Sequence, residues 1–247
     1  MTRILVWDLP VRLLHWALAG SVGAAMAFGF LADDDSPLFQ LHMLFGVVAV
    51  FIVVLRLVWG LVGDRHARLV NFPLHPRELL GYAKDAILKK TRRYAGNNPG
   101  SALAAVLMFL LIPALMISGG AFSRGEAEDL HGALAWGLLA VMVLHLSGLA
   151  WHTIRHRENI AAAMITGTKH GDPADALRSA RPLPALVLLL AGGAWISALF
   201  TNHAPGGAAV RLPLTGTPIR LGEGGDEDGG KTKHARREHR EEHDDDD

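Results

Sequence analysis

Apolar residues are gathered into five long runs along the chain, and shorter polar stretches separate these runs. Four of the runs are about as long as the roughly 20 residues that a helix needs to cross a bilayer. These four runs are residues 11–31, 39–62, 101–122 and 128–157. A fifth run, residues 183–200, is about 18 residues long and is just sufficient to span. The pattern predicts an all-α integral membrane protein, with a four-helix transmembrane bundle in residues 1–182 and a fifth transmembrane helix after it.

The end of the chain differs in composition from the rest. Half of all residues are apolar, whereas charged residues are few in the first 200 positions and crowded after them. Residues 201–247 are rich in glycine and charge and end in HARREHREEHDDDD, so this tail cannot bury an apolar core. We therefore expect a charged, disordered tail whose histidines are solvated.

The chain contains no cysteine. This excludes disulfides, cysteine-ligated iron–sulfur clusters and covalent attachment of haem through a C-x-x-C-H motif. Any haem in this protein must therefore be held without a covalent link, as haem b is.

The loop charges predict how the chain is oriented. The loops at residues 64–100 and 155–181 are basic, whereas those at residues 32–37 and 123–129 are acidic. The positive-inside rule therefore places the N-terminus and both basic loops in the cytoplasm. The four spans alternate in agreement with this rule, which predicts a multi-pass protein of the cytoplasmic (inner) membrane. If the fifth run also crosses, the tail lies outside.

One segment of the first basic loop has helical character. Pro76 is followed by RELLGYAKDAILKK, which indicates a helix start and then an amphipathic, basic stretch. Such a helix can lie flat on the membrane surface. An ordinary solvated helix fits the same pattern equally well.

Four histidines lie inside the predicted spans. His131 and His145 are fourteen positions apart, which corresponds to about 21 Å of helical rise on nearly the same face. With the predicted orientation, His15 and His145 lie at the inner level, and His42 and His131 lie at the outer level. An intramembrane histidine is costly unless it has a partner, and neutral imidazole is a good axial ligand for haem iron. We therefore expect each level-matched pair to hold one haem between two helices.

Other residues compete with these ligands or support them. His152 follows His145 by seven residues on roughly the same face, but it lies at the headgroup boundary, where a structural histidine costs little. Arg12 and Arg56 lie near the cytoplasmic surface and could pair with haem propionates or with lipid phosphate. Glycines recur along the histidine-bearing spans, where they allow close approach of a macrocycle or another helix. They are Gly20, Gly23, Gly46, Gly132, Gly137 and Gly148.

Three sequence stretches and the histidine spacing resemble a known family. The stretches are VWDLPVRLLHW, RLVWGLVGDRHARLVNF and YAGNNPGSA. Over about residues 3–170 the chain resembles the bacterial dihaem cytochrome b561 family, which includes the b-type cytochrome subunits of nickel–iron hydrogenases. The resemblance implies four transmembrane helices that hold two b haems through His15, His42, His131 and His145. It also implies electron transfer between the quinone pool and a partner protein.

The function that we expect is an electron relay across the membrane through two haem b groups, with quinone as a further bound molecule. The expected partners are membrane lipid, quinone and a redox protein such as a hydrogenase or a c-type cytochrome, but no nucleic acid. No residue needs to act as a nucleophile or general base. One alternative is a stand-alone oxidoreductase that transfers electrons from superoxide or another small molecule to quinone. Another is a transporter with a histidine-based proton or metal path, although the broken, repeated spans of such proteins are not seen.

Overall fold

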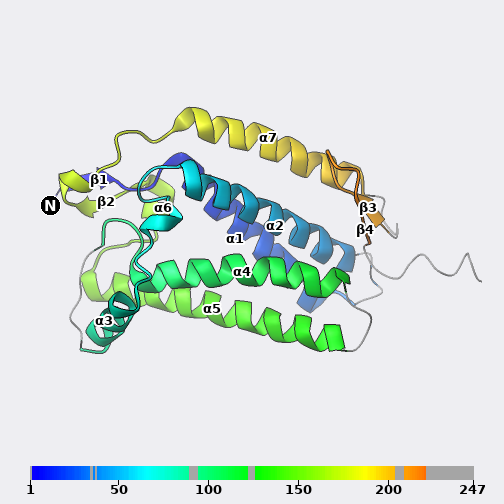
Figure 1. Cartoon of the computed structure of the whole chain (residues 1–247), viewed down its shortest axis with the longest axis horizontal. Helices are drawn as coiled ribbons and strands as arrows, with labels where there is room; N and C mark the ends of the chain where they lie inside the picture. The colour runs from blue at the N-terminus through cyan, green and yellow to red at the C-terminus, as the bar shows by residue number, and fades with distance from the viewer. Residues whose placement is uncertain are drawn as a thin grey trace, which may run out of the picture.

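The computed structural model describes residues 2–33, 36, 38–88, 94–121, 126–203 and 209–220. In this part of the chain five helices are long and apolar enough to cross a membrane. They are α1 (Leu9–Leu31), α2 (Phe39–Val62), α4 (Pro99–Ala121), α5 (Glu126–His156) and α7 (Pro182–Thr201). All five lie along the long axis of the molecule (Figure 1). The predicted helical membrane fold is confirmed, and each helix begins within about two residues of its predicted start.

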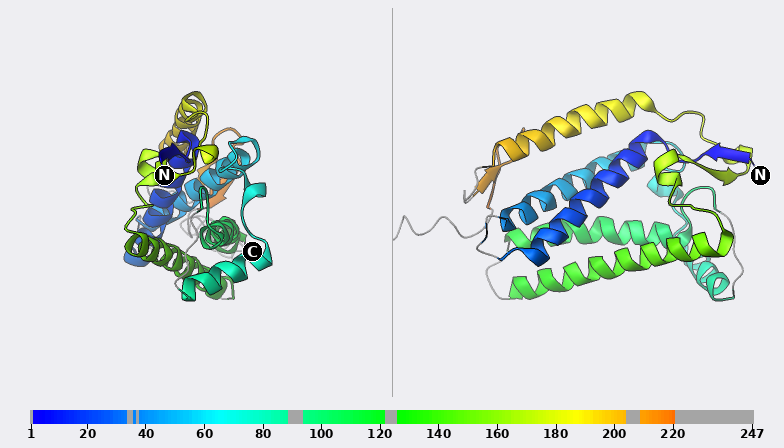
Figure 2. Two further views of the ribbon diagram at one scale, coloured as in Figure 1. Left: turned by 90° about the vertical axis from the view of Figure 1, so that its left-hand side faces the viewer. Right: turned by 180° about the vertical axis from the view of Figure 1, so that it is seen from behind.

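The helices form two antiparallel pairs with α7 added on one side. Helix α1 packs along α2, α4 packs along α5, and α2 also contacts α4, which joins the two pairs into a four-helix bundle. Helix α7 contacts α1 and α2, and it lies on the far side of them from α4 and α5 (Figure 2). Helix α7 therefore packs on the outside of the four-helix bundle, against the α1–α2 pair.

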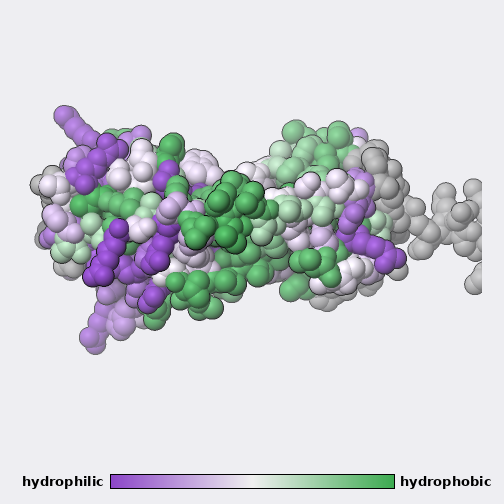
Figure 3. All heavy atoms as spheres, turned by 90° about the horizontal axis from the view of Figure 1, so that it is seen from above, coloured by the Kyte–Doolittle hydropathy of each residue, from purple (hydrophilic) through white to green (hydrophobic). Residues whose placement is uncertain are grey.

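The surface of the long helices is apolar. Leu110, Leu144 and Leu190 are all more than 60% exposed, with Leu144 at 71%. Apolar side chains cover much of the middle of the long axis, and hydrophilic side chains gather at the ends (Figure 3). Because water would oppose such exposure whereas lipid tails would not, this surface is suited to the hydrocarbon of a bilayer.

A buried carboxylate fixes the start of the bundle. Asp8 is the N-cap of α1, and its Oδ1 accepts a hydrogen bond from the backbone N–H of Val11 at 2.8 Å. Its Oδ2 also accepts from the indole Nε1–H of Trp59 in α2 at 3.1 Å. Asp8 is only 1% exposed, and this burial raises the pKa of its carboxyl group. One side chain therefore caps α1 and ties it to the end of α2.

Short elements close the end of the bundle where α1 begins. Strand β1 (Thr2–Leu5) pairs antiparallel with β2 (Thr168–Gly171), so the first residues of the chain meet a segment beyond α5. The α6 turn (Ala163–Thr166) precedes β2, and a 3-10 turn, Pro173–Asp175, follows it. A second 3-10 turn, Leu69–Asn71, lies in the loop after α2. Neither strand was expected from the sequence, because each has only four residues and lacks a turn that links it to its partner.

Helix α3 (Pro76–Ile87) occupies the predicted amphipathic stretch. Among the described elements, α4 is the one against which α3 packs with more than a few contacts. The side chain of Leu80 in α3 is 72% exposed. The helix itself is as predicted, while its position on a membrane surface stays a prediction. Residues 89–93, which complete the basic part of the stretch, lie outside the described residues.

The expectation of a disordered tail is wrong for residues 209–220. These residues form a hairpin of β3 (Ala209–Arg211) and β4 (Pro218–Arg220). Val210 is fully buried and packs in one apolar cluster with Leu44 of α2 and Leu199 of α7. A few apolar residues thus suffice for folding here, because the ends of two helices supply the rest of the core. Residues 221–247, with the charged end of the tail, lie outside the described part of the chain.

Helix α7 is fastened at its start by an ion pair. Arg181, its N-cap, has a left-handed backbone with φ of 55°. Its guanidinium donates two hydrogen bonds of 3.0 Å to the carboxylate of Asp64, in the loop after α2. This bidentate contact holds α7 against the same end of the bundle that the two strands close.

Replacing Asp8 tests the contact between α1 and α2. Asp8→Ala removes the cap and the acceptor for Trp59, and it should lower the free energy of unfolding by about 1–2 kcal/mol. Asp8→Asn removes the charge that is costly to bury and keeps one acceptor oxygen, but its amide NH2 cannot replace Oδ2 as the acceptor for Trp59. It should therefore destabilise the protein less than Asp8→Ala does at pH 7. The measurement is the thermal unfolding midpoint of purified protein in detergent.

The pH dependence gives a second readout of the same contact. Because the pKa of Asp8 is raised in the folded state, the cost of burying its charge is fully present above that pKa and disappears as the pH falls through it. The unfolding midpoint of Asp8→Asn relative to that of the wild type should therefore be higher at pH 8 than near the ordinary carboxyl pKa of 3.8. A relative midpoint that rises on acidification would contradict this interpretation.

Candidate functional site

Two of the four candidate histidines meet at one end of the bundle. His42 lies in the first turn of α2, and His131 lies near the start of α5. The centroids of their imidazole rings are 5.9 Å apart, with the planes at 75°. The structure therefore brings together the pair that was predicted for the outer level, from two helices that are not neighbours in the sequence.

Each of these rings is held by a backbone carbonyl of an adjacent helix. His42 Nδ1 lies 2.8 Å from the carbonyl oxygen of Ala25 in α1. His131 Nδ1 lies 3.1 Å from the carbonyl oxygen of Leu115 in α4 and 3.1 Å from Ser118 Oγ. A carbonyl oxygen can only accept, so Nδ1 carries the proton and Nε2 keeps its lone pair. This is the tautomer that a metal-ligating histidine needs, with the second nitrogen oriented by a backbone acceptor.

Glycines make room for both rings. A Cβ added to Gly29 of α1 would lie 2.7 Å from His42 Nδ1, which is closer than real Cβ atoms approach. A Cβ added to Gly119 of α4 would lie 3.3 Å from His131 Nδ1. The histidines therefore pack directly against the backbone of neighbouring helices. Sequence reasoning missed both glycines, because nothing in their spacing relates them to the histidines.

The other two candidate histidines share a cavity at the opposite end of the bundle. His15 lies in the second turn of α1, and His145 lies toward the end of α5; both line a cavity of about 440 Å³. Nδ1 of His145 is buried, and no hydrogen-bond partner for it exists among the described residues. A buried imidazole without a partner is costly, so this atom fits a cavity that holds a ligand. His152 lines the same cavity, so its exclusion as a ligand stays a prediction.

Most of the side chains that line the cavity from the long helices are apolar. The wall is formed by side chains of α1, α4 and α5, which include Leu18, Val22, Met108, Phe109, Ile112, Leu138 and Met142. Arg56 of α2 also lines it, although this side chain is only 7% exposed. Its Nη2 donates to the carbonyl oxygen of Ala67, and its guanidinium lies 5.9 Å from the centre of the Phe109 ring. A dry wall with one cation suits a flat apolar ligand that carries an anionic group.

Arg12, for which the sequence left a haem propionate and lipid phosphate open as partners, contacts the backbone of another segment. Its guanidinium donates a hydrogen bond to the carbonyl oxygen of Ile165 in α6, and it is not among the residues that line the cavity. Nearby, the indole N–H of Trp16 donates to the carbonyl oxygen of Met164 at 3.1 Å. Two side chains of α1 thus hold the segment that leads into β2, and Arg56 is the arginine that is placed to meet a carboxylate.

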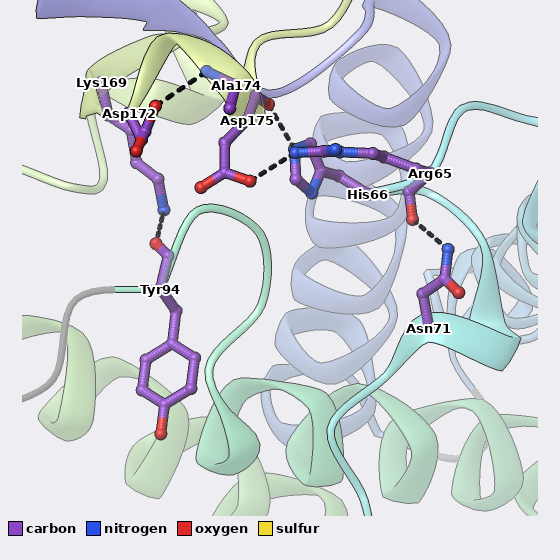
Figure 4. Close-up of polar contacts among 8 residues, drawn as sticks. All are labelled: Arg65, His66, Asn71, Tyr94, Lys169, Asp172, Ala174 and Asp175. Atoms are coloured by element: carbon purple, nitrogen blue, oxygen red, sulfur yellow. Dashed lines mark hydrogen bonds and ion pairs between the residues drawn. The ribbon is translucent and has the colours of Figure 1, made fainter.

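Polar residues surround the mouth of the cavity. Tyr94, Asn98, Glu158, Lys169 and His170 line it, and they come from the loop before α4 and the segment after α5. Figure 4 shows part of this region, with the Lys169 ammonium directed at the carbonyl oxygen of Tyr94. Sequence reasoning counted Lys169 only among the basic loop residues. The signal that could have singled it out is the pairing of β2 with β1, which cannot be seen in the sequence.

The recurring glycines are not explained by packing within the chain. A Cβ added at Gly20, Gly23, Gly46, Gly132, Gly137 or Gly148 would meet no other atom within 4 Å. Contacts between helices of this protein therefore do not require glycine at any of these positions. The other reason given for these glycines, the close approach of a macrocycle, stays a prediction.

Comparison with known proteins decides the family. Residues 6–167, which make up about two thirds of the chain, match the prokaryotic cytochrome b561 family. The chain belongs to this family. It is a membrane-embedded b-type cytochrome of electron transfer, and its cofactor is haem b. The histidine pairs, the buried Nδ1 of His145 and the apolar cavity all fit that cofactor.

Several relatives of this b-type cytochrome share one description. The chain is 24% identical to a probable Ni/Fe-hydrogenase B-type cytochrome subunit of Bradyrhizobium diazoefficiens, over 67% of this chain and 85% of the relative. It is 22% identical to the protein of that description in Rhodobacter capsulatus, over 67% and 81%. It is 23% identical to the protein of the same description in Rhizobium leguminosarum bv. viciae, over 67% of this chain and 88% of the relative. No solved structure matches the chain.

Gly29→Ala tests the packing of His42. The added methyl group must displace the imidazole and weaken its hydrogen bond to Ala25, so haem held through His42 should bind about 10–100-fold more weakly. Gly193→Ala in α7 is the matched control, because its Cβ would meet nothing within 4 Å. Haem content of the two purified variants is compared at equal protein levels. Equal haem content in both would contradict this account of His42.

Proposed function

We propose that this cytochrome holds two haem b groups and relays electrons across the cytoplasmic membrane. The inner group is bound between His15 and His145, and the outer group between His42 and His131. The observation that carries the proposal is the separation of the four histidines into two pairs. His15 lies near the start of α1, whereas His42 lies just beyond the loop that follows α1, so the pairs lie at opposite ends of the bundle.

The residues of the chain orient the ligands and exclude water. The carbonyl oxygens of Ala25 and Leu115 fix the Nδ1–H tautomer of His42 and His131 and leave Nε2 for the metal. The hydrogen bonds that these carbonyl oxygens accept also make the imidazoles more basic ligands. Bound haem b supplies an iron that accepts and releases single electrons. Arg56 places a positive charge in the wall of the inner cavity, where it favours a carboxylate of the cofactor.

The proposed partners are quinone and a redox protein. The relatives are described as Ni/Fe-hydrogenase subunits, which favours a hydrogenase over a c-type cytochrome as the protein partner. Loop charges favour a cytoplasmic N-terminus, because the basic residues are concentrated in the loops after α2 and after α5. With five spans, the β3–β4 hairpin then lies outside, next to the outer histidine pair.

The alternatives have less support. A metal transporter needs clusters of ligands along its path, and no group of three or more His, Asp or Glu that could hold a metal ion occurs among the described residues. A stand-alone oxidoreductase for superoxide or another small molecule is distinguished by turnover of the purified protein without a partner.

Single histidine substitutions test the two pairs. The wild type should contain two haems b per chain by pyridine haemochrome analysis. His42→Ala and His131→Ala should each lose the outer haem, and His15→Ala and His145→Ala should each lose the inner one, because each removes one of the two imidazoles that would hold that haem. Each variant should therefore retain about half of the haem.

The control for these variants is His152→Ala. It should keep both haems, because His152 is expected to be a boundary residue. A wild type with one haem would refute the proposal, and so would matching redox phenotypes for His42→Ala and His145→Ala. Haem loss in His152→Ala with retention in His145→Ala would move the inner ligand to His152.

A topology reporter tests the orientation. Alkaline phosphatase fused after Arg220 should be active, because this enzyme folds only outside the cytoplasm and five spans place the hairpin there. A fusion in the loop after α2, behind Asp64, should be inactive. A fluorescent protein that matures in the cytoplasm should give the opposite result at both positions, and fluorescence after Arg220 would show that α7 does not cross.

A further inference from the structure

Lys169 brings a positive charge to the mouth of the inner cavity. It lies in β2 opposite Ile4 of β1, and its side chain is partly buried and lines the cavity. The Nζ ammonium donates a hydrogen bond to the carbonyl oxygen of Tyr94 at 2.5 Å and another to that of Gly96 at 3.4 Å. Figure 4 shows the ammonium beneath β2, directed at the loop before α4.

The ammonium has no carboxylate in contact with it. Lys169 forms no ion pair among the described residues, and the two carboxylates close enough to act on its charge have other partners. Asp175 accepts from Arg65 Nη2 at 2.5 Å, and Glu158 accepts from the backbone N–H of His170 at 3.2 Å. Burial therefore lowers the pKa of Lys169 to about 8. A partly buried ammonium whose only bonds are to neutral carbonyls is costly unless another anion balances it.

The cavity presents two chemically different ends to a ligand. The side chains from α1, α4 and α5 that line the cavity are mostly apolar, with Arg56 of α2 beside them, whereas those from the loop before α4 and the segment after α5 include Lys169 and other polar groups. An ammonium has three N–H donors, and carbonyl oxygens accept two of those of Lys169. The third donor is available to an anion in the cavity. Such a site suits a ligand with a flat apolar body and a carboxylate at its edge.

We propose that Lys169 binds a propionate carboxylate of the inner haem and raises the reduction potential of that haem. This inference rests on the proposed function, in which His15 and His145 hold the haem. Arg56 contributes a second cation in the wall: its Nη2 donates to the carbonyl oxygen of Ala67, and its buried Nη1 has no hydrogen-bond partner among the described residues. Lys169 is the cation among the polar residues that line the cavity beside β2. Reduction adds one negative charge to the haem, and a nearby ammonium stabilises the reduced form more than the oxidised form.

Charge substitutions at position 169 test the proposal. Potentiometric titration of purified protein, followed in the visible spectrum, resolves the two haems, and His15→Ala identifies which potential belongs to the inner one. Lys169→Gln should lower the potential of the inner haem and leave that of the outer haem unchanged. Lys169→Arg keeps the charge and should restore the inner potential. Lys84→Gln removes the same charge from exposed α3, outside the cavity, and should change neither potential.

A modified cofactor separates a propionate contact from a general charge effect. Apoprotein is reconstituted in detergent with iron protoporphyrin IX or with its dimethyl ester, in which both carboxylates are neutral. The difference between the wild type and Lys169→Gln should be smaller with the ester. Equal differences with both porphyrins would overturn the contact, and an unchanged inner potential in Lys169→Gln would overturn the whole inference. A single haem in the wild type would instead refute the proposed function.

Discussion

The hydrogen bonds from His42 and His131 to backbone carbonyls are the constraint on which the outer site depends. In the interior of a membrane bundle an imidazole N–H must find an acceptor, and helical carbonyls are already used within their own helix. Ala25 and Leu115 each accept an additional bond, and this requires that Gly29 and Gly119 leave the imidazoles room beside the helix backbone. The same close approach sets the imidazole of α2 against the backbone of α1 and that of α5 against the backbone of α4, and the two rings lie edge to face with centroids 5.9 Å apart.

The parts of the fold that depend on single helices could be predicted from the sequence. A transmembrane helix satisfies its own backbone, so length and hydropathy were enough to place all five spans. The fourteen-residue spacing of His131 and His145, combined with loop charges, also indicated which histidines would meet. The ligand roles of these histidines stay predictions.

The parts that were missed depend on contacts between distant segments. Strand β2 exists because β1 pairs with it more than 160 residues earlier, and Val210 folds a hairpin only because Leu44 and Leu199 cover it. Lys169 and Arg12 were assigned by their charge alone, and their actual partners are carbonyl oxygens of other segments. Composition describes such residues as solvated, whereas tertiary structure decides whether they are buried.

The pairing of β1 with β2 has a consequence for how the protein is assembled. Thr2–Leu5 leaves the ribosome first, but Thr168–Gly171 follows only after the fourth long helix has been synthesised. The end of the bundle beside His15 and His145 therefore cannot be closed while the first four helices are being inserted. Until synthesis passes residue 171 the cavity lacks Lys169 and His170, which line it in the folded chain. The inner site is thus completed later in synthesis than the helices that carry its histidines.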